Sequence, residues 1–313
     1  MVNNLMIKFK LIIIVILFFF QTTTIYSKIN IRYKIDDQII TNQDITNEQK
    51  YLLFLRPNLD KISEKELIKI SENSIIREII KKKEINKVFK NFDELNLINK
   101  LKKNLFKFKD VKNDKEFKEL LIKSNLDYKI IIDKIKYEAL WNELIFIRFN
   151  QSIKIDKKLL KQRLISRVSN NKKFEYNLSE LLFELKKDEK LKTLNLKILD
   201  SIKKDGFKST ASKYSIAESS VRGGEIGWIK ETLLSENLNK ILSKTEIGNI
   251  TKPIKIPNGY LILKVNNKKQ IKQKINLENE LKEMENYERN KQLNQFSLLY
   301  FKKLKQNTNI NEY

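Results

Sequence analysis

The segment Gly223-Gly224-Glu225-Ile226-Gly227-Trp228, followed by Asn258-Gly259-Tyr260-Leu261-Ile262-Leu263-Lys264-Val265, decides the fold of this 313-residue chain. All six glycines lie between Gly206 and Gly259. Glycine adopts positive φ angles and lets backbones approach closely, so tight irregular turns are expected in this stretch and nowhere else. The remainder of the chain is predicted to be mostly helical.

The composition limits the chemistry that the chain can perform. It has no cysteine and no histidine, which excludes disulfides, thiolate zinc sites, thiol nucleophiles and the commonest general base and metal ligand. We therefore expect no metal and no cofactor. The net charge of +24 would attract nucleic acid, acidic clients or, weakly, a membrane surface. A lysine-rich solvated surface, set by AT-rich codon usage, explains the same charge.

Residues 1–27 are typical of a secretory signal. Lys8 and Lys10 precede an apolar run over Leu11–Phe20, and small Ser27 offers a cleavage point. The run is too short to span a bilayer as a helix. An uncleaved anchor is the alternative, and it would suit a tethered scaffold for envelope assembly. Either way we expect export to the periplasm, where nucleic acid is not a partner.

The first half of the mature chain, residues 28–170, is predicted to be a helical domain with an N-terminal strand over Ile29–Ile40. Residues 41–149 carry four or five helices. Helix-start patterns occur at Thr41-Asp44, Ser63-Glu66, Asn91-Glu94, Asn113-Glu116 and Ser124-Asp127. The helix over Asp127–Phe149 is apolar around most of its circumference, so we expect it, with Trp141, to be buried.

The pattern of residues changes at Phe174. The predicted elements from there are a strand over Phe174–Leu185, helices over Lys190–Lys204 and Phe207–Tyr214, the glycine-rich stretch as the next strand, a helix over Ser235–Ser243 and a final strand over Tyr260–Val265. This β-α-α-β-α-β order favours an antiparallel sheet with packed helices over residues 171–270. Residues 271–313 contain a long helix from Leu277 to about Leu304 that is expected to return to the helical domain. A linking helix is expected over Asp156–Arg167.

The glycine-rich stretch closely resembles the second half of a parvulin-type peptidyl-prolyl isomerase domain, also called a rotamase or PpiC domain. The resemblance rests on Gly223–Trp228, Gly248–Ile254 and Asn258–Val265 with their spacing. Tyr176-Asn177-Leu178-Ser179 is similar to the first strand of that domain. The wider order of a signal, a strand, a helical domain, one parvulin domain and a returning helix resembles the SurA family of periplasmic chaperones. The fold class implied is therefore α+β.

The resemblance implies an apolar pocket for a proline ring beside a cluster of histidines with a cysteine or aspartate. The peptide-binding residues carried over are Ile226, Leu234, Leu238 and Trp228. The catalytic positions are occupied instead by Glu180, Ala217 and Leu261. Since a single carboxylate on a strand is more often a solvated surface group, Glu180 is expected to be one.

The resemblance therefore implies a periplasmic holdase that binds unfolded outer-membrane protein precursors and proline-containing peptides, with little or no isomerase activity. An active prolyl isomerase with an atypical site is the alternative.

Overall fold

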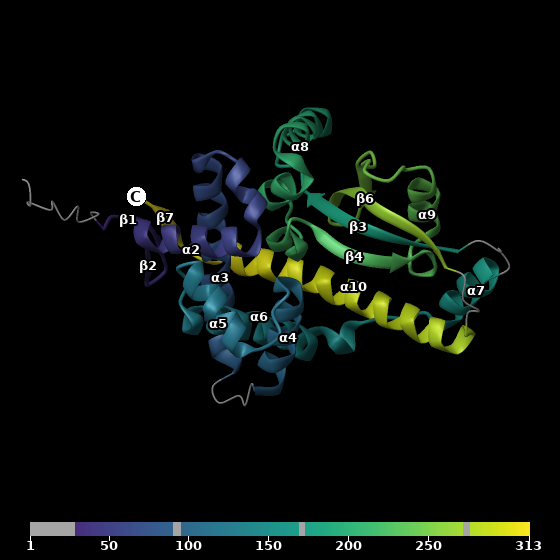
Figure 1. Cartoon of the computed structure of the whole chain (residues 1–313). Helices are drawn as coiled ribbons and strands as arrows, with labels where there is room; N and C mark the ends of the chain where they lie inside the picture. Colours follow the sequence, from purple (N-terminus) through teal and green to yellow (C-terminus); the bar gives the residue numbers. More distant parts are fainter. Residues whose placement is uncertain (1–28, 90–94, 169–172, 272–275) are drawn as a thin grey trace, which may run out of the picture.

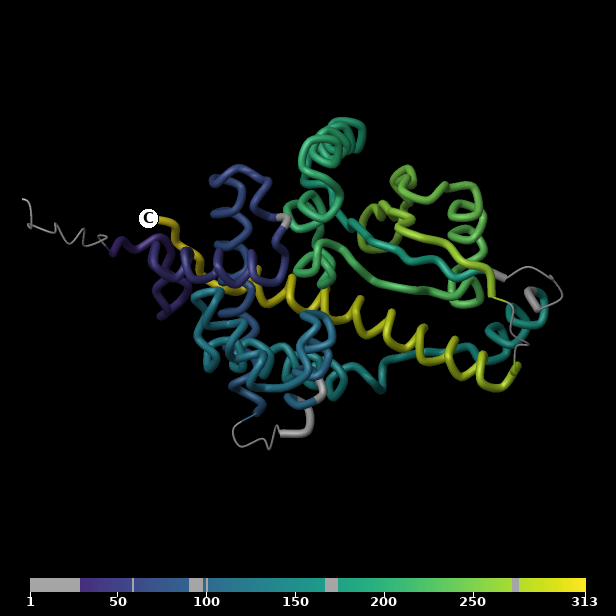
Figure 2. The backbone as a smooth tube through the Cα atoms, in the orientation of Figure 1, coloured from purple at the N-terminus to yellow at the C-terminus, as the bar shows by residue number. Residues whose placement is uncertain are grey.

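The computed structural model describes residues 29–89, 95–168, 173–271 and 276–313 (Figures 1 and 2). The expected signal over residues 1–27 lies outside the described residues. Within the described ranges, no helix is both long enough and apolar enough to cross a membrane. A helical part and a sheet-containing part lie side by side, and the long helix α10, Leu277–Gln306, runs along both (Figure 1).

The helical part begins with a small sheet and continues through consecutive helices. Its elements are β1 Ile31–Ile35, β2 Gln38–Thr41, α2 Asn42–Leu55, η1 Pro57–Lys61, α3 Glu64–Val88, α4 Leu95–Lys109, α5 Asp114–Lys123, α6 Tyr128–Phe149, η2 Asn150–Ser152 and α7 Lys157–Val168. The predicted helix starts at Thr41, Ser63 and Asn113 are confirmed, because each side chain accepts a hydrogen bond from a backbone N–H three residues later.

Two sequence predictions for this part are wrong. The single strand expected over Ile29–Ile40 is a hairpin that turns at Asp36, whose φ of 49° lies in the left-handed region that aspartate tolerates. The helix start expected at Ser124 is displaced, since Ser124 ends α5 and Asp127 caps α6 instead. The pattern at Asn91-Glu94 lies outside the described residues.

The sheet-containing part has the predicted order with one additional strand. Its elements are β3 Lys173–Phe183, α8 Leu191–Tyr214, η3 Glu218–Arg222, β4 Glu225–Lys230, η4 Glu231–Leu233, α9 Glu236–Ser243, β5 Ile254–Ile256 and β6 Gly259–Ile271. The four strands are antiparallel and lie in the order β4-β3-β6-β5. The two helices predicted on either side of Gly206 are confirmed, because α8 is interrupted there: Gly206 has the non-helical angles φ 81° and ψ 163°.

The two faces of this sheet are covered by different helices. On one face Leu181, Phe183 and Ile262 pack against Ile198 and Phe207 of α8. The opposite face, which we call the α9 face, carries the following residues of β3 and β6: Tyr176, Leu178, Glu180, Leu261, Leu263 and Val265. Because side chains alternate along a strand, this division follows from the register. The α9 face is the one that α9 and α10 approach.

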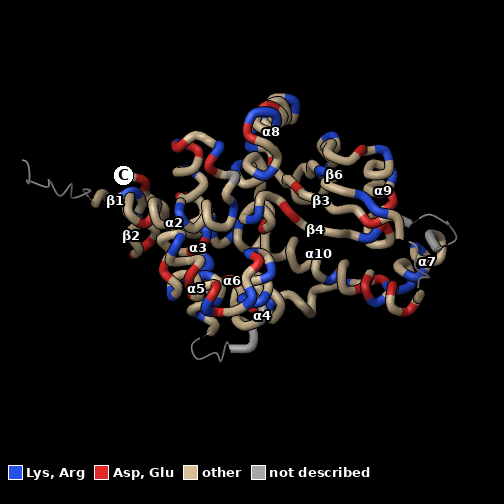
Figure 3. Tube along the Cα trace, viewed as in Figure 1, with Lys and Arg blue, Asp and Glu red and all other residues tan. Residues whose placement is uncertain are grey.

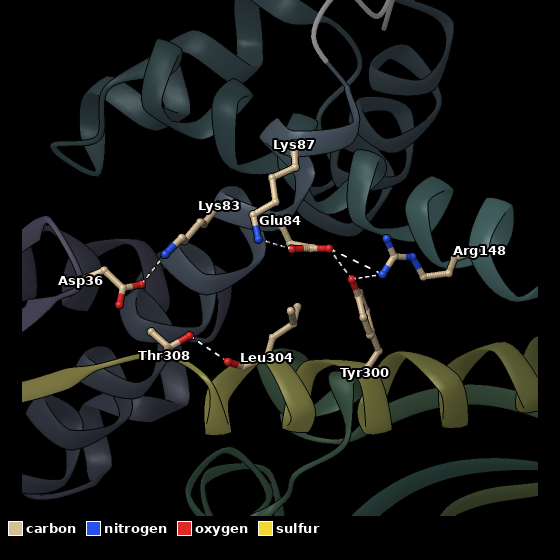
Figure 4. Close-up of polar contacts among 8 residues, drawn as sticks. All are labelled: Asp36, Lys83, Glu84, Lys87, Arg148, Tyr300, Leu304 and Thr308. Carbon is tan, nitrogen blue, oxygen red and sulfur yellow. Dashed lines mark hydrogen bonds and ion pairs between the residues drawn. The ribbon is translucent and has the colours of Figure 1, made fainter.

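Helix α10 is anchored in the helical part at its C-terminal end. The Tyr300 hydroxyl donates to Glu84 of α3 and accepts from Arg148 of α6 (Figure 4). Glu84 also pairs with Lys87 at 2.9 Å and with Arg148 at 3.6 Å. The ring of Tyr300 stacks on Trp141 with centroids 5.9 Å apart. The returning C-terminal helix is therefore confirmed, and so is the burial of Trp141, which is 0% exposed.

A short strand after α10 joins the two ends of the described chain. This strand, β7 Ile310–Glu312, pairs with β1 to complete a sheet of order β2-β1-β7. Lys83 binds Asp36 at 2.6 Å beside it (Figure 4). The hydrophobic pattern of the last residues is too short to predict such a strand.

Candidate functional site

The glycine-rich stretch passes close to the backbone of β3, and this fixes the geometry of the candidate site. A Cβ atom on Gly224 would lie 2.1 Å from the carbonyl oxygen of Glu180, and the φ of Gly224 is +80°. The Gly224 carbonyl accepts from the Glu180 N–H at 2.7 Å. Only glycine satisfies both requirements, so this turn needs the residue that the sequence supplies.

Three of the four predicted peptide-binding residues gather at the α9 face. Leu234 is 2% exposed and lies in the cluster with Tyr176, while Ile226 and Leu238 are partly buried against it. Trp228 is not brought to this cluster. Its neighbour Ile229 belongs to the α9 face, and Trp228 is 43% exposed with Lys269 4.4 Å from its ring centroid. The structure therefore separates Trp228 from the other three predicted residues, which contact the α9-face cluster.

The three predicted catalytic positions lie along the same end of the sheet. Leu261 pairs with Leu182 of β3 and packs on the α9-face cluster. Ala217 precedes η3, and its N–H donates to the Ser215 hydroxyl at 3.3 Å. Glu180 also lies on the α9 face, opposite Leu263 of β6.

Glu180 is not the solvated surface group that the sequence suggested. Its side chain is partly buried, and Oε1 accepts from the Ser219 hydroxyl at 2.8 Å. Burial raises the pKa of Glu180, although the Ser219 hydrogen bond and the positive charge of Arg222 oppose the rise. The prediction is wrong because η3 and α10 cover this part of β3, and both lie far from it in the sequence.

Tyr287 of α10 is the residue at this site that sequence reasoning did not find. It packs against the α9-face cluster that contains Leu234. Burial raises the pKa of Tyr287 to about 12, with the negative charges of Glu180 and Glu288 adding to the rise. In the sequence, Tyr287 is only one of several apolar residues of a long predicted helix. No local pattern indicated that its side chain would contact the sheet. In the structure, its side chain covers part of the α9 face.

The segment η3 attaches the sheet-containing part to the helical part next to this site. Glu218 Oε1 accepts from the Ser297 hydroxyl of α10 at 2.6 Å and from Trp141 Nε1 at 3.2 Å. Lys81 of α3 pairs with the same oxygen at 3.2 Å. Burial favours a raised pKa for Glu218, but the charge of Lys81 and the Ser297 hydrogen bond together lower it. Glu218 thus connects four elements through one charged oxygen.

The described residues contain no group of three or more acidic, histidine or cysteine side chains arranged to hold a metal ion.

Residues 169–267 match the family model described as "Rotamase: PPIC-type PPIASE domain". The chain therefore carries a PPIC-type domain. The match covers the strand, the kinked helix and the glycine-rich stretch described above, so the resemblance noted from the sequence is confirmed.

The chain is also similar to proteins named Chaperone SurA. The one from Pseudomonas putida is 27% identical over 162 residues, which is 49% of this chain and 38% of that protein. The one from Methylococcus capsulatus is 24% identical over 159 residues, 48% of this chain and 35% of that protein. The aligned part thus spans well under two thirds of the length of these relatives. A SurA-like chaperone of Campylobacter jejuni has a solved structure with 18% identity, a TM-score of 0.37 and coverage of 90% of this chain and 98% of its own.

The PPIC-type domain of this chain lacks the histidines that its family resemblance led us to expect, because the sequence contains none. Glu180 is the one titratable side chain among the three replaced positions. Its raised pKa allows it to donate a hydrogen bond when protonated and to accept one when ionised. The arrangement therefore combines an apolar surface with a single carboxyl group.

Proposed function

We propose that this protein is a periplasmic chaperone that holds unfolded outer-membrane protein precursors, and that its PPIC-type domain serves for peptide binding. The observation that carries the proposal is the α9 face, where an apolar cluster persists although the three catalytic positions hold Glu180, Ala217 and Leu261. Unpaired strands associate edge to edge through their free backbone groups. An apolar surface that binds the alternating apolar side chains of such strands would keep the strands apart.

The helical part supplies further apolar surface for the same task. Large apolar side chains are exposed on α5 and α6, including Ile122, Ile130, Phe146 and Ile147. Basic and acidic residues are interspersed along the backbone of both parts of the molecule (Figure 3). Such a mixed surface suits contact with unfolded protein more than a continuous track for nucleic acid, which requires clustered basic residues.

Aggregation of an unfolded outer-membrane β-barrel protein, followed by light scattering, tests the proposal. We expect suppression at a several-fold excess of the purified protein over the barrel. Leu238→Ser removes an apolar contact of the α9 face and is expected to weaken suppression. Leu199→Ser is the matched control, because Leu199 lies on α8 and is 36% exposed. Unchanged aggregation with the wild-type protein would refute the proposal.

An active prolyl isomerase is the second candidate, and the raised pKa of Glu180 beside the apolar cluster favours it. It predicts accelerated cis-to-trans exchange in a proline-containing peptide, lost in Glu180→Gln. The uncatalysed exchange takes tens to hundreds of seconds, so a modest acceleration is measurable. The holdase proposal expects the exchange to remain at its background rate, and the two assays together separate the candidates.

A further inference from the structure

A cavity of about 230 Å³ lies where α2, α3, α8, η3 and α10 meet, away from the α9 face. One ordered water needs only about 15 Å³ measured in this way, so the cavity has room for a small solute. Four of its lining residues are basic, namely Arg56, Arg77, Lys213 and Lys305, and none is acidic. The basic residues around the cavity therefore come from the helical part, from α8 and from α10.

Arg56 is the most buried of these cations, with 5% of its surface exposed. One of its terminal nitrogens donates to the Ser212 hydroxyl and to the Ser220 carbonyl oxygen at 3.0 Å, both uncharged acceptors. Its Nε is buried and has no hydrogen-bond acceptor in the described part of the chain. Burial lowers the pKa of Arg56 to about 10. A buried guanidinium normally pairs with an anion, and here no carboxylate lines the cavity.

Arg77 and Lys305 have no carboxylate partner among the residues that line the cavity, although the negative charge of Glu218 acts on Arg77 from outside it. Arg77 lies over the ring of Phe301 at 5.5 Å, and neither cation forms an ion pair among the described residues. The pKa of Lys305 is lowered by burial and by the positive charge of Arg77. Lys213 differs from them, because it is paired with Glu66.

The three cations other than Lys213 differ in their exposure to solvent. Arg56 is buried, Arg77 is partly buried and Lys305 is exposed. Cations held close together repel one another, and a negative charge between them would relieve the repulsion. Guanidinium groups match the geometry of carboxylate and phosphate oxygens, since their N–H groups point in parallel.

We propose that this cavity binds a small oxyanion of the phosphate or carboxylate class, held by Arg77 and Lys305 with Arg56 behind them. The bound anion would join α3 and α10 next to Arg56, which itself donates to Ser212 and Ser220 of the PPIC-type domain, and would thereby stabilise the contact between the two parts of the molecule. This site is independent of the peptide-binding function proposed for the α9 face.

Thermal unfolding of the full chain tests the site with inorganic phosphate, acetate and chloride at one ionic strength. We expect phosphate or acetate to raise the melting temperature saturably above the value in chloride. Arg77→Gln and Lys305→Gln should each weaken anion binding, so that the anion concentration giving half of the rise in melting temperature increases at least tenfold. Lys303→Gln is the control, because it removes the same charge from the same turn of α10 without lining the cavity.

The pattern of responses identifies the source of the anion or overturns the proposal. A response to phosphate alone assigns a phosphate group, and a response to acetate assigns a carboxylate. Equal melting temperatures in all three salts would overturn the proposal. Equal weakening by Lys303→Gln and Lys305→Gln would also overturn it, because general charge screening would then explain the response. Lys305 is exposed, so its substitution leaves the fold intact.

Discussion

Glu180 and Glu218 are two carboxylates of the PPIC-type domain that respond to burial in opposite ways. Glu180 has a hydroxyl partner, Ser219, and its pKa is raised, chiefly by burial. Glu218 undergoes comparable burial, but Lys81 and Ser297 lower its pKa. A charged partner therefore decides whether a buried carboxyl favours its ionised form.

The two carboxylates are coupled through neighbouring residues of η3. Glu218 reaches the helical part, while the next residue, Ser219, donates to Glu180 on the sheet. A change in how Glu218 is held therefore changes the position of the donor to Glu180. Substitutions that remove one partner at a time test this coupling. They show whether a change at the contact between the two parts also affects the α9 face.

Glu218→Ala is expected to have the largest effect. It leaves Lys81 without its ion-pair partner and Trp141 Nε1 with one acceptor fewer. Removing a charged acceptor that serves several donors costs about 2 kcal/mol of unfolding free energy, measured by urea denaturation. Glu225→Ala is the control, because the Glu225–Lys208 pair is exposed at 3.4 Å and is worth only about 0.5 kcal/mol.

Equal losses for Glu218→Ala and Glu225→Ala would contradict the role of Glu218 as the polar attachment between the two parts. At low pH the two substitutions should differ less in the unfolding free energy that they cost. The pKa of Glu218 is lowered from the ordinary value of 4.5, so its contribution is complete above that pH and is lost as the pH falls through the lowered pKa.

Tyr287→Ala is expected to have the next largest effect. The partly buried ring leaves the α9-face cluster, which lowers the unfolding free energy by about 1 kcal/mol. The uncovered surface should bind an apolar proline-containing peptide several-fold more tightly, as measured by fluorescence anisotropy. Leu299→Ala on the same helix is the control, since Leu299 is 51% exposed. Weaker peptide binding in Tyr287→Ala would show that the ring is part of the binding surface and does not compete for it.

The sequence was sufficient for three of the four apolar residues expected at the candidate site, Trp228 being the exception. Ile226, Leu234 and Leu238 were implied by the resemblance to parvulin-type domains, and the structure brings them together. Tyr287 and the burial of Glu180 were not predictable in this way. Both depend on how α10 and η3 pack on the sheet, and a packing partner that is distant in the sequence leaves no periodic signal at the residue it covers.

Glu180→Gln is expected to have the smallest effect, and its sign is opposite to that of Glu218→Ala. The raised pKa of Glu180 means that the folded protein retains a proton that the unfolded chain loses above the ordinary value of 4.5. The unfolding free energy of the wild-type protein therefore falls, relative to Glu180→Gln, as the pH rises from 4.5 through the raised pKa. At neutral pH the variant should be slightly more stable than the wild-type protein, since the glutamine side-chain oxygen can still accept from Ser219 and no charge is buried.

Urea denaturation of both proteins between pH 4 and pH 8 measures this difference. The two curves should meet near the acidic end and separate as the pH rises, with the variant above. Separation in the other direction would mean that Glu180 is held in its ionised form, in which case Arg222 outweighs burial. Glu218→Gln should show the reverse pH dependence, because its carboxylate is stabilised by Lys81. The pair of variants thus tests directly whether a charged partner decides the behaviour of a buried carboxylate in this domain.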